Sequence, residues 1–126
     1  MLSNIPLYAT IPVKDLRKSM DFYSRTLGMD IIDEDEMGVW YQAGDTRFAL
    51  YISEFAGTSK APAVIWVVQQ PEKLVKILMG RGIDFDVHDG HGKVVASRGE
   101  MYTRGRYKAV WFKDPSGNII CIAGNR

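Results

Sequence analysis

Residues 15–28, DLRKSMDFYSRTLG, have the pattern of one amphipathic helix with a defined start and a defined end. Asp15 suits the position before the first turn, because its carboxylate can accept the free backbone N–H groups there. Gly28 suits the left-handed residue that ends many helices. Apolar side chains recur between them close to the helical period, at Leu16, Met20, Tyr23 and Leu27. Apolar and alternating runs predict one strand before this helix, at about 6–13, and three after it, near 29–33, 38–42 and 46–52.

The same order of elements returns in the second half of the chain. An apolar run over 63–68 predicts a strand, Pro71 opens a helix where a missing N–H is harmless, and Gly82 ends that helix. Further strands are expected near 84–88, 107–113 and 118–123. Residues 89–106 are rich in Gly, Arg and Lys and have no period, so we expect a long loop there and a candidate lid. The sequence thus predicts an α+β protein of two βαβββ modules, at about 5–53 and 62–124.

Composition narrows the class of protein further. The chain has 126 residues, which suits a single domain over 1–126, and its 16 Lys and Arg against 15 Asp and Glu leave a net charge of +1. Such a charge gives no general attraction to nucleic acid or to an anionic membrane. Cys121 is the only cysteine, so no internal disulfide can form. Because we also see no signal peptide and no apolar run near the roughly 20 residues that span a bilayer, we expect a cytoplasmic protein without membrane or nucleic-acid partners.

Three motifs carry a resemblance that covers nearly the whole chain: Asp15-Leu16, then Asp21-Phe22-Tyr23 with Leu27-Gly28, then Asp114-Pro115-Ser116-Gly117-Asn118. At this separation they resemble the vicinal oxygen chelate superfamily, which includes glyoxalase I, bleomycin-resistance proteins, fosfomycin-resistance enzymes and extradiol dioxygenases. The resemblance implies two modules whose strands form an open, cupped mixed sheet. Members of this size are commonly dimers with shared pockets, and the edges of an open sheet need covering, so we expect a homodimer.

The resemblance also says where a metal would be held. Metal enzymes of the superfamily take two ligands from each module, usually His and Glu, on its first and last strands. The equivalent positions here are Tyr8, Ala49, Ala63 and Cys121. Two alanines cannot bind a metal, and no His or Glu lies within two positions of these four residues. We therefore expect no metal site and no cofactor.

The same positions predict what lines the cup. Side chains alternate between the two faces of a strand, so the alternate neighbours of the four positions should also face the cup. The predicted lining is Tyr8, Thr10, Arg47, Ala49, Tyr51, Ala63, Ile65, Val67, Ala109, Trp111, Ile119 and Cys121. The opposite faces are apolar and should pack under the helices, at Ile11, Val13, Phe48, Leu50, Ile52, Val64, Trp66, Ile120 and Ile122. From the lining we select seven ligand-binding candidates: Tyr8, Thr10, Arg47, Tyr51, Ile65, Trp111 and Cys121.

Several of these candidates also have an ordinary structural explanation. Tyr8 would orient a ligand through its hydroxyl, or that hydroxyl bonds to the backbone. Trp111 and Tyr51 would stack on a ligand, or their rings simply fill the cup. For Arg47 we favour a side chain that extends out to water. For Cys121 we favour an inert buried thiol, because no neighbouring base is visible.

Two charged clusters outside the cup are given structural interpretations. His88-Asp89-Gly90-His91, with Asp86 before it, has metal-ligating side chains, but its turn residues favour a solvated loop. The acidic run at 33–36 would attract a cation, but we expect a solvated hairpin turn. Neither cluster supplies a catalytic residue that the sequence can assign.

These observations favour a metal-free binding protein of the glyoxalase/bleomycin-resistance type. As in drug-sequestering members of the superfamily, it would hold an aromatic or amphipathic molecule by stacking and apolar burial. A metal-independent lyase, isomerase or oxygenase-like enzyme is one alternative, with Tyr8, His88 or Cys121 transferring protons. A protein-interaction or regulatory domain with a filled cup is the other.

Overall fold

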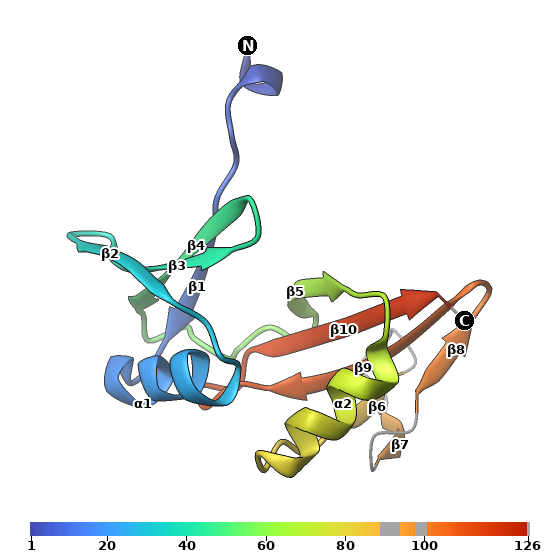
Figure 1. The fold of residues 1–126 in the computed structure, drawn as a ribbon. Coiled ribbons are helices and arrows are strands. Elements are labelled where there is room, and N and C mark those ends of the chain that lie inside the picture. The colour runs from blue at the N-terminus through green and yellow to red at the C-terminus, as the bar shows by residue number, and fades with distance from the viewer. Residues whose placement is uncertain (89–93, 98–100, 126) are drawn as a thin grey trace. The chain divides into compact units, whose positions relative to one another are not determined.

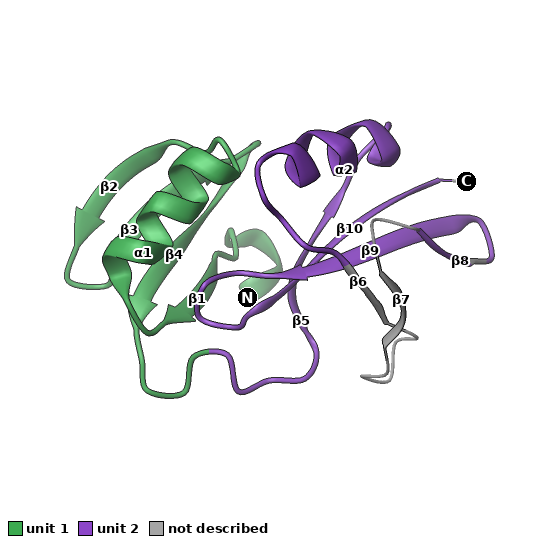
Figure 2. Cartoon of the chain, turned by 90° about the horizontal axis from the view of Figure 1, so that it is seen from below, with its two compact units in different colours: residues 1–56 green, residues 57–126 purple. Residues whose placement is uncertain are grey.

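The computed structural model describes residues 1–88, 94–97 and 101–125, with the backbone alone for 86–88, 94–97 and 104. The chain consists of two compact units, unit 1 over Met1–Ala56 and unit 2 over Gly57–Arg126 (Figure 2). This boundary falls between the two predicted modules. Whether both modules act as one domain stays a prediction. Each unit contains one α-helix packed beside a mixed sheet, so the predicted α+β class is confirmed. The βαβββ order of unit 1 returns in unit 2, with two further strands after the helix.

Unit 1 is a four-stranded sheet in the order β1-β4-β3-β2 (Figure 1). The strands are β1 (Ala9–Val13), β2 (Ile31–Asp35), β3 (Gly38–Ala43) and β4 (Thr46–Ile52), and a 3-10 turn, η1 (Leu2–Asn4), precedes them. β1 runs parallel to β4, and the other two pairs are antiparallel. β4 has the bounds that its alternating sequence predicts, and β1 and β3 differ from prediction only at their ends.

The helix of unit 1 begins where the sequence predicts but changes type halfway. Asp15 accepts a hydrogen bond from the Lys18 backbone N–H at 3.0 Å, and α1 (Leu16–Asp21) follows. The next turn, η2 (Phe22–Thr26), is π-helical, and Gly28 then has a φ of 70°. A short run of apolar positions cannot separate α from π turns, because their periods differ by less than one residue. The π turn brings Tyr23 to full burial against Tyr41 and Phe48.

The acidic run is placed differently from its prediction. Residues 33–35 belong to β2, and the turn is formed by Glu36 and Met37 instead. β2 is an edge strand whose residues are all exposed, so neither face imposes an apolar alternation that would have revealed the strand. Charged side chains on such an edge also discourage pairing with another chain.

Unit 2 is a sheet in the order β5-β10-β9-β6-β7, and β8 also pairs with β9. Its elements are β5 (Pro62–Val67), α2 (Pro71–Gly80), β6 (Asp86–His88), β7 (Val94–Ser97), β8 (Tyr102–Arg104), β9 (Tyr107–Lys113) and β10 (Ile119–Asn125). The predicted loop at 89–106 is therefore wrong where it is described, because β7 and β8 lie within it. Strands of three or four residues are too short to show a period, and pairing with β6 and β9 forms them. The rest of that loop, 89–93 and 98–100, lies outside the described residues.

The predicted helix-facing positions are mostly confirmed as core. Six of the nine are buried: Ile11, Val13, Phe48, Leu50, Ile120 and Ile122. Ile52 is a correction, since it lies at the end of β4 and 66% of it is exposed. Val64 and Trp66 are partly buried because β5 is an edge strand.

The turn at 114–118 has a clear structural role in unit 2. One oxygen of the buried Asp114 carboxylate accepts the backbone N–H groups of Ser116 and Asn118, each at 2.9 Å. Its other oxygen accepts the Asn118 side-chain amide at 2.9 Å. The Asn118 Oδ1 atom in turn accepts the Gly57 N–H at 3.2 Å, so the turn fastens the first residue of unit 2 to the start of β10.

Candidate functional site

The sheet of unit 1 has one face toward α1 and one face away from it. Phe48 packs against Tyr23, so the odd-numbered residues of β4 around it lie on the face away from the helix. These are Arg47, Ala49 and Tyr51. The register places Thr10 of β1 on one side of Ala49 and Trp40 of β3 on the other. The side chains of Thr10, Arg47 and Tyr51 therefore all lie on the face of the sheet that is turned away from α1.

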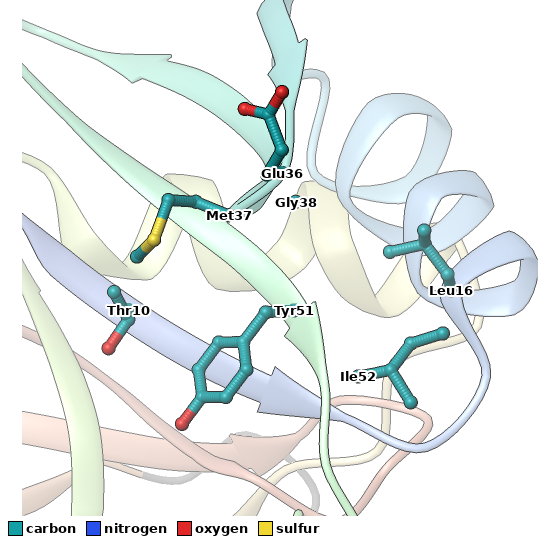
Figure 3. A pocket seen from close by; sticks show the side chains of 7 residues that line it. All are labelled: Thr10, Leu16, Glu36, Met37, Gly38, Tyr51 and Ile52. Atoms are coloured by element: carbon teal, nitrogen blue, oxygen red, sulfur yellow. The ribbon is translucent and has the colours of Figure 1, made fainter.

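A hollow of about 640 Å³ opens at one end of this unit (Figure 3). Its lining residues are Thr10, Leu16, Glu36, Met37, Gly38, Tyr51 and Ile52. In Figure 3 the side chains of Thr10, Met37 and Tyr51 gather on one side of β4, while Leu16 and Ile52 lie where that strand ends. The walls are mainly apolar, and the hydroxyls of Thr10 and Tyr51 offer donors and acceptors. That combination suits a small organic molecule with few polar groups.

Arg47 occupies a corner formed by two aromatic rings. Its guanidinium carbon lies 4.6 Å from the centre of the Tyr8 ring and 4.9 Å from that of Trp40. The two rings contact edge to face, with centres 5.9 Å apart and planes at 83°. The Arg47 side chain is partly buried and its Nε atom is shielded from solvent, so its stem is covered. The expectation that its end extends to water stays a prediction. Cation–π attraction to both rings explains this position.

Trp40 and Asp35 were not among the site residues predicted from the sequence. The Trp40 indole N–H points at the Asp35 carboxylate, 3.1 Å from each of its oxygens. Asp35 also accepts the Met37 backbone N–H at 2.8 Å, so one carboxylate holds both the indole and the hairpin turn. The alternation along β3 would have indicated the orientation of Trp40, because this residue stands between the buried Val39 and Tyr41. In the first module, the family-based positions and their alternate neighbours covered only the first and last strands, which left β3 out.

Unit 2 brings its three candidates into one row across neighbouring strands. Cys121 of β10 pairs with Ile65 of β5 on one side and with Trp111 of β9 on the other. Ile65 is 58% exposed, but Trp111 is only 9% exposed and has the Tyr102 ring 6.1 Å away. Burial raises the pKa of the Cys121 thiol to about 11, so this cysteine is a poor nucleophile at neutral pH. Contact of Trp111 with a ligand stays a prediction.

The positions equivalent to metal ligands lack the His and Glu side chains that usually hold the metal. Tyr8, Ala49, Ala63 and Cys121 include two side chains with no donor atom. The register sets Thr10 beside Ala49 and Ile65 beside Cys121, and neither neighbour is a His or Glu. Within residues 1–88, 94–97 and 101–125, no three His, Cys, Asp or Glu side chains are grouped to hold an ion. The cluster at 88–91 lies largely outside the described residues.

No helix in the described part of the chain has the length and apolar character to cross a membrane.

Comparison with solved structures gives close matches to the whole fold. TnmS3, an antibiotic binding protein from Streptomyces sp. CB03234, aligns with a TM-score of 0.74 at 20% identity over 98% of both chains. A glyoxalase/bleomycin resistance protein/dioxygenase from Alicyclobacillus acidocaldarius aligns with a TM-score of 0.73 at 18% identity, over 97% of this chain and 92% of that one. A glyoxalase/bleomycin resistance protein from Streptomyces sp. CB03234 reaches 0.67 at 21% identity, over 94% and 97%.

Comparison at the level of sequence agrees with the fold. Curated protein sequences gave no match. The family model for the Glyoxalase/Bleomycin resistance protein/Dioxygenase superfamily matches residues 5–122, which include both units and all three motifs that carry the resemblance. The chain therefore belongs to the glyoxalase/bleomycin resistance protein/dioxygenase superfamily.

Proposed function

We propose that this chain is a metal-free binding protein for a small aromatic or amphipathic molecule. The observation that carries the proposal is the hollow of about 640 Å³ on unit 1, with apolar walls and the hydroxyls of Thr10 and Tyr51. Its volume falls within the range of ligand pockets in proteins. The alanines at two metal-equivalent positions favour binding without a metal. The fold shared with TnmS3, which is an antibiotic binding protein, supports the same class of function.

A titration with N-phenyl-1-naphthylamine, a neutral fluorescent aromatic molecule, tests this proposal. We expect saturable binding to the wild type in the presence of EDTA, because apolar burial needs no metal. Thr10→Phe places a ring in the hollow and should weaken binding about tenfold or more, since a loss of 1.4 kcal/mol is a factor of ten. Isothermal or fluorescence titration of both proteins measures the difference.

The matched control is Ile77→Phe, which adds a ring to an exposed position of α2 in unit 2. It should bind the probe as the wild type does. Absence of binding to the wild type, or equal affinity of Thr10→Phe, would overturn the proposal. Binding that disappears with EDTA and returns with a divalent metal would overturn its metal-free part.

We also propose a homodimer. β5 is an edge strand, and its Ile65 and Val67 side chains are 58% and 70% exposed, which leaves apolar surface for a second copy. Sedimentation equilibrium should give twice the chain mass of 14.2 kDa. Val67→Asp should shift the mass toward the monomer, and a monomeric wild type at micromolar concentration would contradict the proposal.

A further inference from the structure

The side chain of Arg47 lacks the partner that a sheltered arginine normally has. Its Nε–H is buried and meets no hydrogen-bond acceptor within the part of the chain that the structure describes. The ion pairs of Arg25 with Asp21 and of Lys108 with Glu72 do not involve it. An unsatisfied donor on a charged group is costly, so this N–H calls for an acceptor that the described residues themselves do not supply.

Two polar side chains on the neighbouring strands have hydrogen bonds to other groups. Gln42 is the residue opposite Arg47 in β3, but its side-chain amide donates to the Gly44 carbonyl. The Asp35 carboxylate accepts the indole of Trp40 and the backbone of Met37. The guanidinium is therefore held by aromatic rings, which leave its in-plane N–H groups available to an acceptor from outside.

Arg47 also lies on the same face as the hollow. Arg47 and Tyr51 are four residues apart on β4, so at about 3.3 Å per residue their Cα atoms are about 13 Å apart. Ala49 lies between them and has a side chain too small to form a barrier. A molecule of two or three rings seated against Tyr51 is long enough to carry a polar group to Arg47.

We infer that the ligand is an aromatic organic anion whose carboxylate or sulfonate group pairs with Arg47. This inference rests on the proposed binding function and deepens it by naming the charge of the ligand. The planar guanidinium can donate two parallel hydrogen bonds to such a group, and bonds of this kind are about twice as strong as neutral ones. The Tyr8 ring beside the charge is 41% exposed, so an aromatic ligand can stack on it. Asp35 acts as a positioning residue, because it holds the indole of Trp40.

Two probes of matched shape distinguish the contribution of the ligand's charge to binding from that of its aromatic rings. 8-Anilinonaphthalene-1-sulfonate carries the sulfonate that N-phenyl-1-naphthylamine lacks, and both become fluorescent in apolar surroundings. We expect the wild type to bind the sulfonate probe more tightly. Arg47→Met keeps a long apolar side chain and removes the charge. It should lower the affinity for the sulfonate probe about tenfold or more, and the affinity for the neutral probe less than about twofold.

Arg17→Met, an exposed arginine on α1, is the matched control and should leave both affinities unchanged. Each titration is paired with a thermal melt, so that only folded protein is compared. If the neutral probe binds but Arg47→Met weakens both probes equally or neither, the inference is wrong and the binding function stands. If neither probe binds the wild type, the binding function itself fails. Arg47→Lys should recover only part of the lost affinity, because an ammonium cannot match the two oxygens of the anion.

Discussion

Replacing Gly57 with alanine should destabilise unit 2 by about 3 kcal/mol or more. Gly57 has a φ of +72°, a conformation that costs roughly 1–2 kcal/mol for a residue with a Cβ. An added Cβ would also overlap the backbone carbonyl of Ser116, which cannot move freely because the turn is held by Asp114. Overpacking of this kind costs about 1–3 kcal/mol more. Urea unfolding of the two proteins measures the difference in the free energy of unfolding.

Gly44→Ala is the matched control for this prediction. Gly44 has a φ of +57°, but a Cβ there meets no atom within 4 Å. It should therefore show the conformational cost alone, about 1 kcal/mol. Equal losses for the two variants would show that the approach to Ser116 contributes nothing. A Gly57→Ala protein as stable as the wild type would contradict the anchoring role of the turn at 114–118.

Replacing Tyr41 with alanine should cost unit 1 about 3–5 kcal/mol, the range for removing a buried aromatic side chain. Tyr41 is fully buried, stacks on Phe48 with ring centres 5.6 Å apart, and packs against Tyr23 at 6.0 Å. Its loss would leave a cavity between the helix and the sheet. Since Tyr41 follows Trp40 in β3, we also expect weaker binding of the sulfonate probe. Urea unfolding and probe titration check the two effects.

Tyr41→Phe isolates the contribution of the hydroxyl. That hydroxyl shares a 2.7 Å hydrogen bond with Ser24 and donates to the Met20 carbonyl at 3.2 Å, which ties β3 to the helix. Burial raises the pKa of Tyr41, so the hydroxyl stays protonated at neutral pH. We expect a loss of about 1 kcal/mol for the net hydrogen bonding and little change in probe affinity. A loss as large as that of Tyr41→Ala would mean that the hydroxyl, and not the ring, holds the core together.

The order of the helices and strands could be predicted because it depends on interactions between residues that are close in the sequence. Asp15 caps the first helix, Pro71 starts the second, and alternating runs give β4 and β9 with their bounds. These signals act within a few residues of one another, so they need no knowledge of the rest of the fold. The face on which Thr10, Arg47 and Tyr51 lie follows from the same alternation. Short motifs, including the turn at 114–118, likewise indicated the superfamily.

The environment of each side chain was decided by tertiary structure. The strands β2, β7 and β8 carry little periodic signal of their own and are formed by pairing with neighbours. The corner around Arg47 joins residues from two strands and the segment before a third: Trp40 in β3, Arg47 in β4 and Tyr8 just before β1. They become adjacent only once the sheet has formed. Sequence can assign a residue to a face through its local period. It cannot say which distant residue will be its neighbour, because strand order and register depend on burial and hydrogen bonding summed over the whole sheet.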